Sequence, residues 1–256
     1  MPAKDRNGQL TTLEGKTALV TGAARRIGSA IATGLHSAGA RVVIHYRNSA
    51  TDARALVARL NSARADSALA ARADLLDTAT LPGLVDAVID WAGRLDILVN
   101  NASSFYATPI GRIDEKAWDD LVGTNLKAPL FLAQAAAPEL ARSRGSIVNI
   151  IDIHAQRPLR EHAVYGSAKA GLQMLTRALA KDLAPAVRVN GVAPGTILWP
   201  ENGMSEKVRR LILDQVPLER SGRPEDIAGC VLYLVRDADY VTGQVIAVDG
   251  GRSIGW

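Results

Sequence analysis

Short apolar runs alternate with longer amphipathic stretches along almost the whole chain, and this alternation limits the possible folds more than any other sequence feature. The apolar runs, which predict strands, are 16–21, 41–45, 67–72, 95–100, 145–150, 187–192 and 245–248. The amphipathic stretches, which predict helices, are 25–37, 51–64, 78–93, 116–142, 164–183 and 224–236. Strands that are apolar on both faces are buried on both faces, and intervening helices join them as parallel neighbours through right-handed crossovers. The sequence therefore predicts an α/β fold, a doubly wound sheet of seven mostly parallel strands with helices on both faces.

Length and composition fit one such unit. The chain has 256 residues, of which 48% are hydrophobic and 22% charged, and no linker or repeat divides it. We expect a flexible tail at 1–14 and a single Rossmann-type domain at 15–256. No apolar run reaches the roughly 18 residues that a membrane span needs, and the N-terminus lacks a signal-peptide core, so we expect a cytoplasmic protein. The net charge of +4 is spread along the chain, which argues against a nucleic-acid partner.

Two helices carry more specific expectations. Thr51 is the expected N-cap of the second helix, because its hydroxyl can accept a bond from the first turn. The stretch 116–142 is expected to hold one long helix or two.

A glycine-containing turn follows the first predicted strand. Gly22 allows a sharp turn and Gly28 allows the next helix to pack closely on the sheet, so the helix N-terminus can face a pyrophosphate. Arg25 and Arg26 stand where the helix dipole disfavours cations, which indicates an anion supplied by a ligand. The alternative is two solvated surface arginines.

The end of the second strand bears on which dinucleotide the turn would bind. An acid at this place would bond the ribose hydroxyls of NAD, but the segment 45–49 holds no carboxylate. Arg47 and Ser49 can instead bind a 2′-phosphate, so we predict NADPH over NADH. Asp74, at the end of the third strand, is expected near the adenine. The alternative is an ordinary polar loop.

A tyrosine and a lysine stand four residues apart on a predicted helix. This spacing places Tyr165 and Lys169 on one face, where the ammonium is expected to lower the tyrosine pKa and make it a usable proton donor. Asp152 closes the fifth strand, and Asn125 lies within the long helical stretch. A surface pair is the alternative for Tyr165 and Lys169 taken alone.

Taken together these elements resemble the short-chain dehydrogenase/reductase family. The matching pieces, in chain order, are the turn 21–28, Asn100-Asn101-Ala102, Asn125, Tyr165 with Lys169, Pro194-Gly195 and Val248-Asp249-Gly250-Gly251. The resemblance implies that Tyr165 is the acid/base, that Lys169 binds the nicotinamide ribose and that Asn125 holds a water in a proton path. It also implies a homotetramer. The cofactor site is expected to comprise Gly22, Arg25, Arg26, Ile27, Gly28, His45, Tyr46, Arg47, Asn48, Ser49, Asp74, Leu75, Asn101, Ala102, Ser103, Tyr165, Lys169, Pro194, Gly195 and Thr196.

The sequence departs from the family pattern at two positions, and these departures point to one subgroup of the family. Arg26 stands where the family usually has a third glycine, and Asp152 where it usually has a serine. Both departures, with the run Asn101 to Tyr106, are similar to the pteridine reductases within the family. That similarity implies that Arg26 contacts both cofactor phosphate and pterin, that Ser103 lies near the ligand, and that Phe105 stacks on the pterin ring.

The resulting hypothesis is hydride transfer from NADPH to a pteridine such as dihydrobiopterin, biopterin, dihydrofolate or dihydromonapterin. Tyr165 and Asp152 would supply the proton to an oxidised pterin. The expected substrate contacts are Arg26, Ser103, Phe105, Asp152, Tyr165 and Trp199, the last of which could instead serve loop packing. The histidines lack metal-ligand spacing, so no metal is expected. The alternatives are a reductase of a ketone or 3-oxoacyl thioester, and a non-catalytic NADPH-binding regulatory protein.

Overall fold

The computed structural model describes residues 12–198, 203 and 205–254. A seven-stranded sheet with the order β3-β2-β1-β4-β5-β6-β7 forms its centre, and every neighbouring pair is parallel. The strands are β1 (Thr17–Val20), β2 (Arg41–Tyr46), β3 (Ala68–Arg72), β4 (Ile97–Asn100), β5 (Ser146–Ile150), β6 (Arg188–Pro194) and β7 (Val245–Val248). The predicted doubly wound fold is confirmed.

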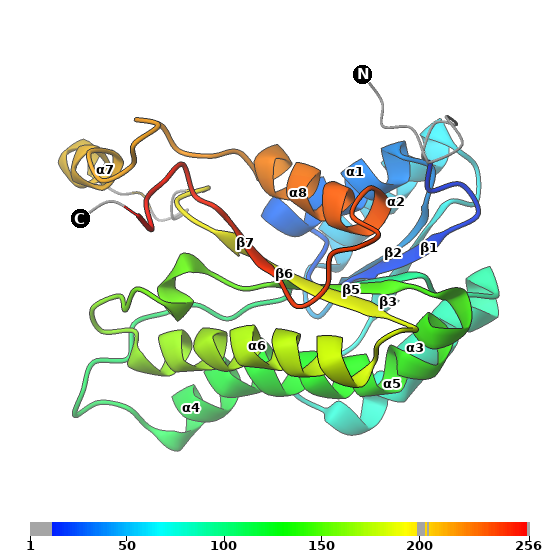
Figure 1. Ribbon diagram of the computed structural model, residues 1–256, viewed down its shortest axis with the longest axis horizontal. Helices are drawn as coiled ribbons and strands as arrows, with labels where there is room; N and C mark the ends of the chain where they lie inside the picture. The colour runs from blue at the N-terminus through cyan, green and yellow to red at the C-terminus, as the bar shows by residue number, and fades with distance from the viewer. Residues whose placement is uncertain (1–11, 199–202, 204, 255–256) are drawn as a thin grey trace.

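Helices cover both faces of this sheet (Figure 1). They are α1 (Arg26–Ser37), α2 (Ala50–Ala63), α3 (Leu81–Ala92), α4 (Glu115–Val122), α5 (Ala128–Ser143), α6 (Ala163–Asp182), α7 (Glu206–Leu213) and α8 (Pro224–Arg236). Shorter turns are the 3₁₀ segments Thr78–Thr80 and Ile153–Ala155 and the π-helical segment Gly123–Lys127. Helices α1, α2 and α8 lie on one face and α3, α5 and α6 on the other, whereas α7 lies apart, beyond the carboxyl end of β6 (Figure 1).

Successive residues of the strands pack into two separate hydrophobic cores, one on each face of the sheet. In β1, Ala18 and Val20 belong to the cluster under α1 and α8, while Leu19 belongs to the cluster under α3 and α5. All three side chains are fully buried. Because successive side chains point to opposite faces, a strand between two helical layers must be apolar at every position.

Three local details differ from the sequence expectations. Thr51 was wrongly expected to cap α2, since Ser49 holds that place and Thr51 already lies in the first helical turn. The stretch 116–142 forms two helices, because the π-helical segment separates α4 from α5. Helix α7 was not expected, although Ser205 caps it by accepting a bond from the N–H of Val208.

The strand order reverses between β1 and β4, which are neighbours in space. In doubly wound sheets, ligands bind at the carboxyl ends of the strands at such a reversal. Thr21 ties the two ends together: its hydroxyl accepts bonds from the N–H groups of Asn101 and Ala102, at 2.9 and 3.0 Å. The loops that follow β1 and β4 therefore form one rigid edge.

Candidate active site

The turn after β1 needs both of its glycines. Gly22 has a φ of 59°, and a Cβ placed on it would lie 2.9 Å from the Cα of Ala102. A Cβ on Gly28 would lie 2.4 Å from the carbonyl oxygen of Gly22 and 2.5 Å from Nδ2 of Asn101. Gly28 therefore packs closely, and its contacts are with the turn and with the loop after β4.

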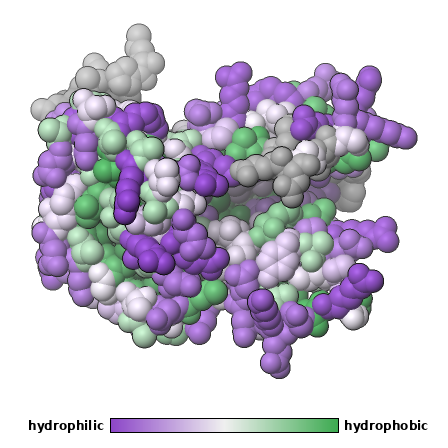
Figure 2. Space-filling view, turned by 180° about the vertical axis from the view of Figure 1, so that it is seen from behind, coloured by the Kyte–Doolittle hydropathy of each residue, from purple (hydrophilic) through white to green (hydrophobic). Residues whose placement is uncertain are grey.

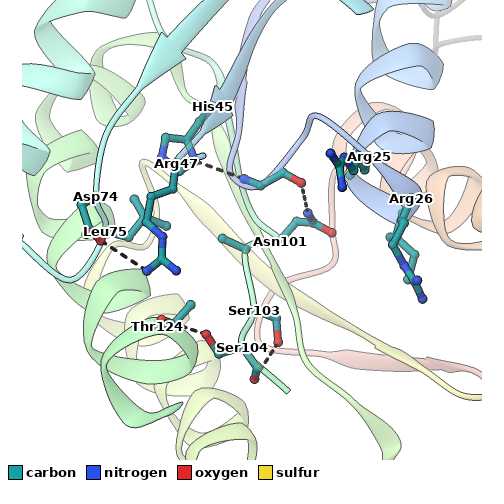
Figure 3. A pocket seen from close by; sticks show the side chains of 14 residues that line it. Arg25, Arg26, His45, Arg47, Asp74, Leu75, Asn101, Ser103, Ser104 and Thr124 are labelled. Atoms are coloured by element: carbon teal, nitrogen blue, oxygen red, sulfur yellow. Dashed lines mark hydrogen bonds and ion pairs between the residues drawn. The ribbon is translucent and has the colours of Figure 1, made fainter. Parts of the chain in front are cut away.

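Arg26 adopts a backbone conformation that favours glycine. Its φ is 55°, in the left-handed region, at the position where the family pattern has its third glycine. Arg25 forms an ion pair with Asp52 on α2, with Nη2 2.6 Å from Oδ2. Figure 3 shows the two side chains diverging from the start of α1.

His45 fixes this turn from the neighbouring strand. The N–H of Gly22 donates to Nδ1 of His45 at 3.1 Å, and Nε2 lies 3.2 Å from the carbonyl oxygen of Ala73 (Figure 3). Because a carbonyl only accepts, Nε2 carries a proton. Nδ1 accepts the N–H of Gly22 and so carries none, which makes the ring neutral. Burial lowers the pKa of His45 to about 4, despite opposing contributions from Ala73 and Asp74. The ring therefore remains uncharged at neutral pH.

A cavity of about 360 Å³ opens above this turn (Figure 3). It is lined by Gly22, Arg25, Arg26, Ile27, Gly28, His45, Arg47, Asp74, Leu75, Asn101, Ala102, Ser103, Ser104 and Thr124. Arg47 lies 3.8 Å from a carboxylate oxygen of Asp74, so the two charged side chains occupy one end of the cavity together. We call this cavity the first recess.

A second cavity, also of about 360 Å³, adjoins the first. It is lined by Arg26, Ile27, Asn101, Ser103, Phe105, Ile150, Ile151, Asp152, His154, Tyr165, Lys169, Pro194, Gly195, Thr196, Ile197, Leu198 and Ile212. We call it the second recess. Arg26, Ile27, Asn101 and Ser103 line both recesses, so the two form one continuous site.

The second recess brings together the three chemistry-bearing side chains expected there. The hydroxyl of Tyr165 donates to Oδ2 of Asp152 at 2.7 Å. The ammonium of Lys169 donates to the carbonyl oxygen of Ile150 at 2.9 Å and lies 5.8 Å from the centre of the Tyr165 ring. Asp152 follows β5 by two residues and also accepts the N–H of His154, which holds the carboxylate in place.

The expectation that Lys169 lowers the pKa of Tyr165 is wrong for this arrangement. Burial, followed by the charge and hydrogen bond of Asp152, raises the pKa of Tyr165 well above its ordinary value. Burial also lowers the pKa of Lys169 to about 8. The carboxylate contacts the phenol directly, whereas the ammonium is more distant, so Tyr165 is held as a protonated donor.

Asn125 lies beneath the recesses, on the π-helical segment. Its amide nitrogen donates to the carbonyl oxygens of Ser104 and Leu121, both at 2.9 Å. Its side-chain oxygen accepts the hydroxyl of Ser103 at 2.7 Å. In this structure the side chain thus holds the loop 101–104, which lines the first recess and part of the second, and its expected contact with a water stays a prediction.

The remaining expected residues form two groups, and several lining residues were not expected. Tyr46, Asn48 and Ser49 do not line either recess, and Trp199 lies outside the described residues. Residues that the sequence reasoning missed include Ser104, Thr124, Ile150, Ile151, Ile197, Leu198 and Ile212. Ile212 is on α7, whose capping serine and apolar spacing were the available signal.

Comparisons with known proteins agree with this geometry. Residues 22–253 match the family model described as Enoyl-(Acyl carrier protein) reductase. The chain is 40% identical to pteridine reductase 1 of Leishmania tarentolae over 281 residues, which covers 93% of this chain and 96% of that protein. The chain belongs to the short-chain dehydrogenase/reductase family. Its fold and the order of its motifs are therefore those of an oxidoreductase.

Other short-chain dehydrogenases/reductases are similarly close. The chain is 41% identical over 252 residues to "Granaticin polyketide synthase putative ketoacyl reductase 2" of Streptomyces violaceoruber, with 94% of this chain and 97% of that protein covered. A solved structure described as a "putative short-chain alcohol dehydrogenase" from Sinorhizobium meliloti 1021 superposes with a TM-score of 0.91 at 35% identity, covering 96% of this chain and 99% of that one. Identity alone does not separate these substrate classes.

The family implies a nicotinamide cofactor, and the residues of the first recess fit one. Gly22 and Gly28 leave the space that a Cβ would fill, so backbone and ligand can approach closely. The first N–H groups of any α-helix lack acceptors within the helix itself, and α1 has no side-chain capping bond at its start. This helix terminus suits a pyrophosphate.

Among the described residues, no helix is long and apolar enough to cross a membrane. Within the same ranges, no group of three or more His, Cys, Asp or Glu side chains is arranged to hold a metal ion. On the one face that Figure 2 draws, hydrophilic side chains are interspersed with smaller hydrophobic areas.

Proposed function

We propose that this protein reduces a pteridine ring with NADPH. The observation that carries the proposal is the carboxylate of Asp152, bonded at 2.7 Å to the hydroxyl of Tyr165 in a recess that Phe105 also lines. A reductase of simple ketones needs a neutral hydrogen-bond donor for the substrate carbonyl. A carboxylate instead suits the N–H and amino groups of a nitrogen-rich ring, to which it can bond.

The side chains of the second recess have separate roles. Tyr165 holds a proton, because burial and Asp152 raise the pKa of its hydroxyl. Asp152 orients that hydroxyl and faces the ring nitrogens of the substrate. Lys169 is fully buried beside them and fixes the end of the recess nearest β5 through the carbonyl of Ile150. When bound, the nicotinamide cofactor supplies the hydride.

The choice of NADPH rests on the first recess. Arg47 lines it, and the segment 45–49 that closes β2 contains no carboxylate to repel a 2′-phosphate. Asp74 keeps the guanidinium of Arg47 at the recess edge through their 3.8 Å contact. A phosphate there would bond Arg47 in a charge-assisted manner.

A substrate panel tests the proposal. Oxidation of NADPH and of NADH is followed at 340 nm with dihydrobiopterin, biopterin, dihydrofolate, dihydromonapterin and an acetoacetyl thioester. We expect the highest kcat/KM with a pterin and NADPH. A higher kcat/KM for the thioester would replace the pteridine assignment, and preference for NADH would remove the role given to Arg47.

Ketoacyl reduction is the second candidate function. It is supported by 41% identity to the Streptomyces ketoacyl reductase. It also uses the same tyrosine and lysine, which this chain retains as Tyr165 and Lys169. Asp152 disfavours it, because a carboxylate repels the electron-rich oxygen of a carbonyl substrate. Tight NADPH binding without turnover of any panel member would instead favour a non-catalytic, regulatory protein.

A further inference from the structure

An exposed phenylalanine at the mouth of the second recess is held by two other rings. Phe105 is 55% exposed, although it follows a buried strand by only five residues. Its ring stacks on His162 with centroids 4.7 Å apart and planes 20° apart. It also meets the ring of Tyr165 edge-on, at 4.8 Å and 77°. These contacts fix the ring plane of a side chain that solvent would otherwise leave free to rotate.

His162 is itself anchored. It precedes α6, and its Nδ1 lies 2.7 Å from the carbonyl oxygen of Arg160. Since a carbonyl only accepts, Nδ1 donates, and this bond fixes the orientation of the imidazole within its own loop. His162 thus offers Phe105 a defined surface.

The two loops that carry these rings are joined by a backbone contact. The N–H of Thr108 donates to the carbonyl oxygen of Glu161 at 2.6 Å, and Thr108 is only 4% exposed. Glu161 adopts a φ of 64°, which is uncommon for a side-chain-bearing residue. The stack and this hydrogen bond together make one wall from the segments 105–108 and 160–162.

We propose that His162 is a positioning residue that sets the plane of Phe105 and thereby favours flat, aromatic substrates. The inference rests on the proposed pteridine function and names the device that selects its substrate class. His162 takes one face of Phe105, and the exposed part of Phe105 lines the second recess, where a planar ring can pack against it. A non-planar acyl chain would gain nothing from this fixed plane.

Binding of biopterin to the NADP⁺-loaded enzyme tests the proposal. Isothermal titration compares the wild type with His162→Leu, which keeps bulk without an aromatic ring, and with His162→Phe, which restores the stack. We expect His162→Leu to weaken biopterin binding about three- to tenfold, as for loss of one aromatic pair. His162→Phe is expected to recover wild-type binding. Arg160→Ala, which removes an exposed side chain but leaves its carbonyl, is the matched control.

Repeating His162→Leu in a Phe105→Ala background separates an indirect from a direct role. If His162 acts through Phe105, the second substitution has no further effect on biopterin affinity. An equal loss in both backgrounds would mean that His162 touches the ligand itself and would overturn the positioning role. Unchanged affinity in His162→Leu would also overturn it.

The NADP⁺ affinity of each variant shows that the site is folded. If His162→Leu loses NADP⁺ binding, His162→Phe is compared with the wild type instead. Weakened biopterin binding in His162→Phe would contradict the stacking role of His162. A wild type that binds NADP⁺ but not biopterin would overturn the proposed function and this inference together. If the wild type binds biopterin and only the variants bind it more weakly, the result bears on the role of His162 and leaves the proposed function intact.

Discussion

The carboxylate of Asp152 contacts the hydroxyl of Tyr165 directly. The sequence predicted that Asp152, Tyr165 and Lys169 meet in the second recess, since the four-residue spacing on a helix and the end of β5 determine their positions. It did not predict the protonation of Tyr165, because that depends on distances and burial. The phenol touches a carboxylate at 2.7 Å, while the ammonium lies farther away. Burial first, and then this carboxylate, raise the pKa of Tyr165.

Replacing the carboxylate with the hydroxyl usual in the family tests this point. We expect Asp152→Ser to lower kcat/KM for pterin reduction about 100-fold or more, the typical contribution of a positioned acid or base. Removing Asp152 also removes a cause of the raised pKa of Tyr165, so the alkaline limb of the pH–rate profile shifts to lower pH. Steady-state kinetics across pH measures both effects.

Binding of NADPH provides the control for this variant. Asp152 is not among the residues expected to bind the cofactor, so NADPH affinity, measured by fluorescence titration, is expected to stay within about twofold. Undiminished pterin turnover in Asp152→Ser would contradict the role of the carboxylate.

Among the elements, strands and long helices followed from the sequence, while short turns did not. The strand β4 is apolar in the order Ile-Leu-Val, and no helix period competes with that pattern. The π-helical segment Gly123–Lys127 has no such pattern. It depends on tertiary packing, where a Cβ on Gly123 would lie 2.6 Å from Leu76. Local propensity could not reveal that contact.

The junction of β1 and α1 is sterically restricted. We expect Gly28→Ala to destabilise the fold by roughly 1–3 kcal/mol, because its methyl group would overlap the carbonyl of Gly22 and displace the turn. NADPH affinity is expected to fall with it. Chemical denaturation and cofactor titration measure the two effects.

Gly83→Ala is the matched control for the same substitution. Gly83 lies on an exposed position of α3, and nothing lies within 4 Å of an added Cβ. There we expect a gain of about 0.4–1 kcal/mol from the smaller unfolded-state entropy. Equal effects at the two positions would mean that the turn tolerates a side chain.

On the scale of the whole molecule, His45 connects three parts of the sheet edge. Through its two ring nitrogens it joins the turn after β1 to the residue after β3, from its own place on β2. The sequence indicated a strand ending in histidine, yet only the fold shows both nitrogens used within the protein. A charged ring could not accept the N–H of Gly22.

The global stability should therefore depend on pH through this residue. The pKa of His45 is about 4 in the folded protein and near 6.5 when unfolded, so the unfolded chain binds the proton more readily. The neutral ring contributes fully above pH 6.5, and its contribution is lost as pH falls toward 4. Between pH 7.5 and 5 we expect a loss of about 2 kcal/mol in unfolding free energy.

Urea denaturation of wild type and His45→Asn at both pH values measures this contribution. Asparagine does not titrate, so the variant is expected to be less stable at pH 7.5 but to lose less stability on acidification. The pH-dependent contributions of the carboxylates and of His36 are the same in both proteins and cancel in the comparison. Burial lowers the pKa of His36 as well. Parallel pH dependences in the two proteins would assign the acid sensitivity elsewhere.

One guanidinium, that of Arg26, borders both compartments of the site. The cofactor and the substrate would both bind next to Arg26, so the binding of either one changes the electrostatic field at the other. Thermodynamic linkage makes this influence mutual. The bound cofactor, which is anionic, alters the entrance through which the planar substrate reaches the second recess. We therefore expect the cofactor and the pterin to change each other's Kd by the same factor, rather than to bind independently.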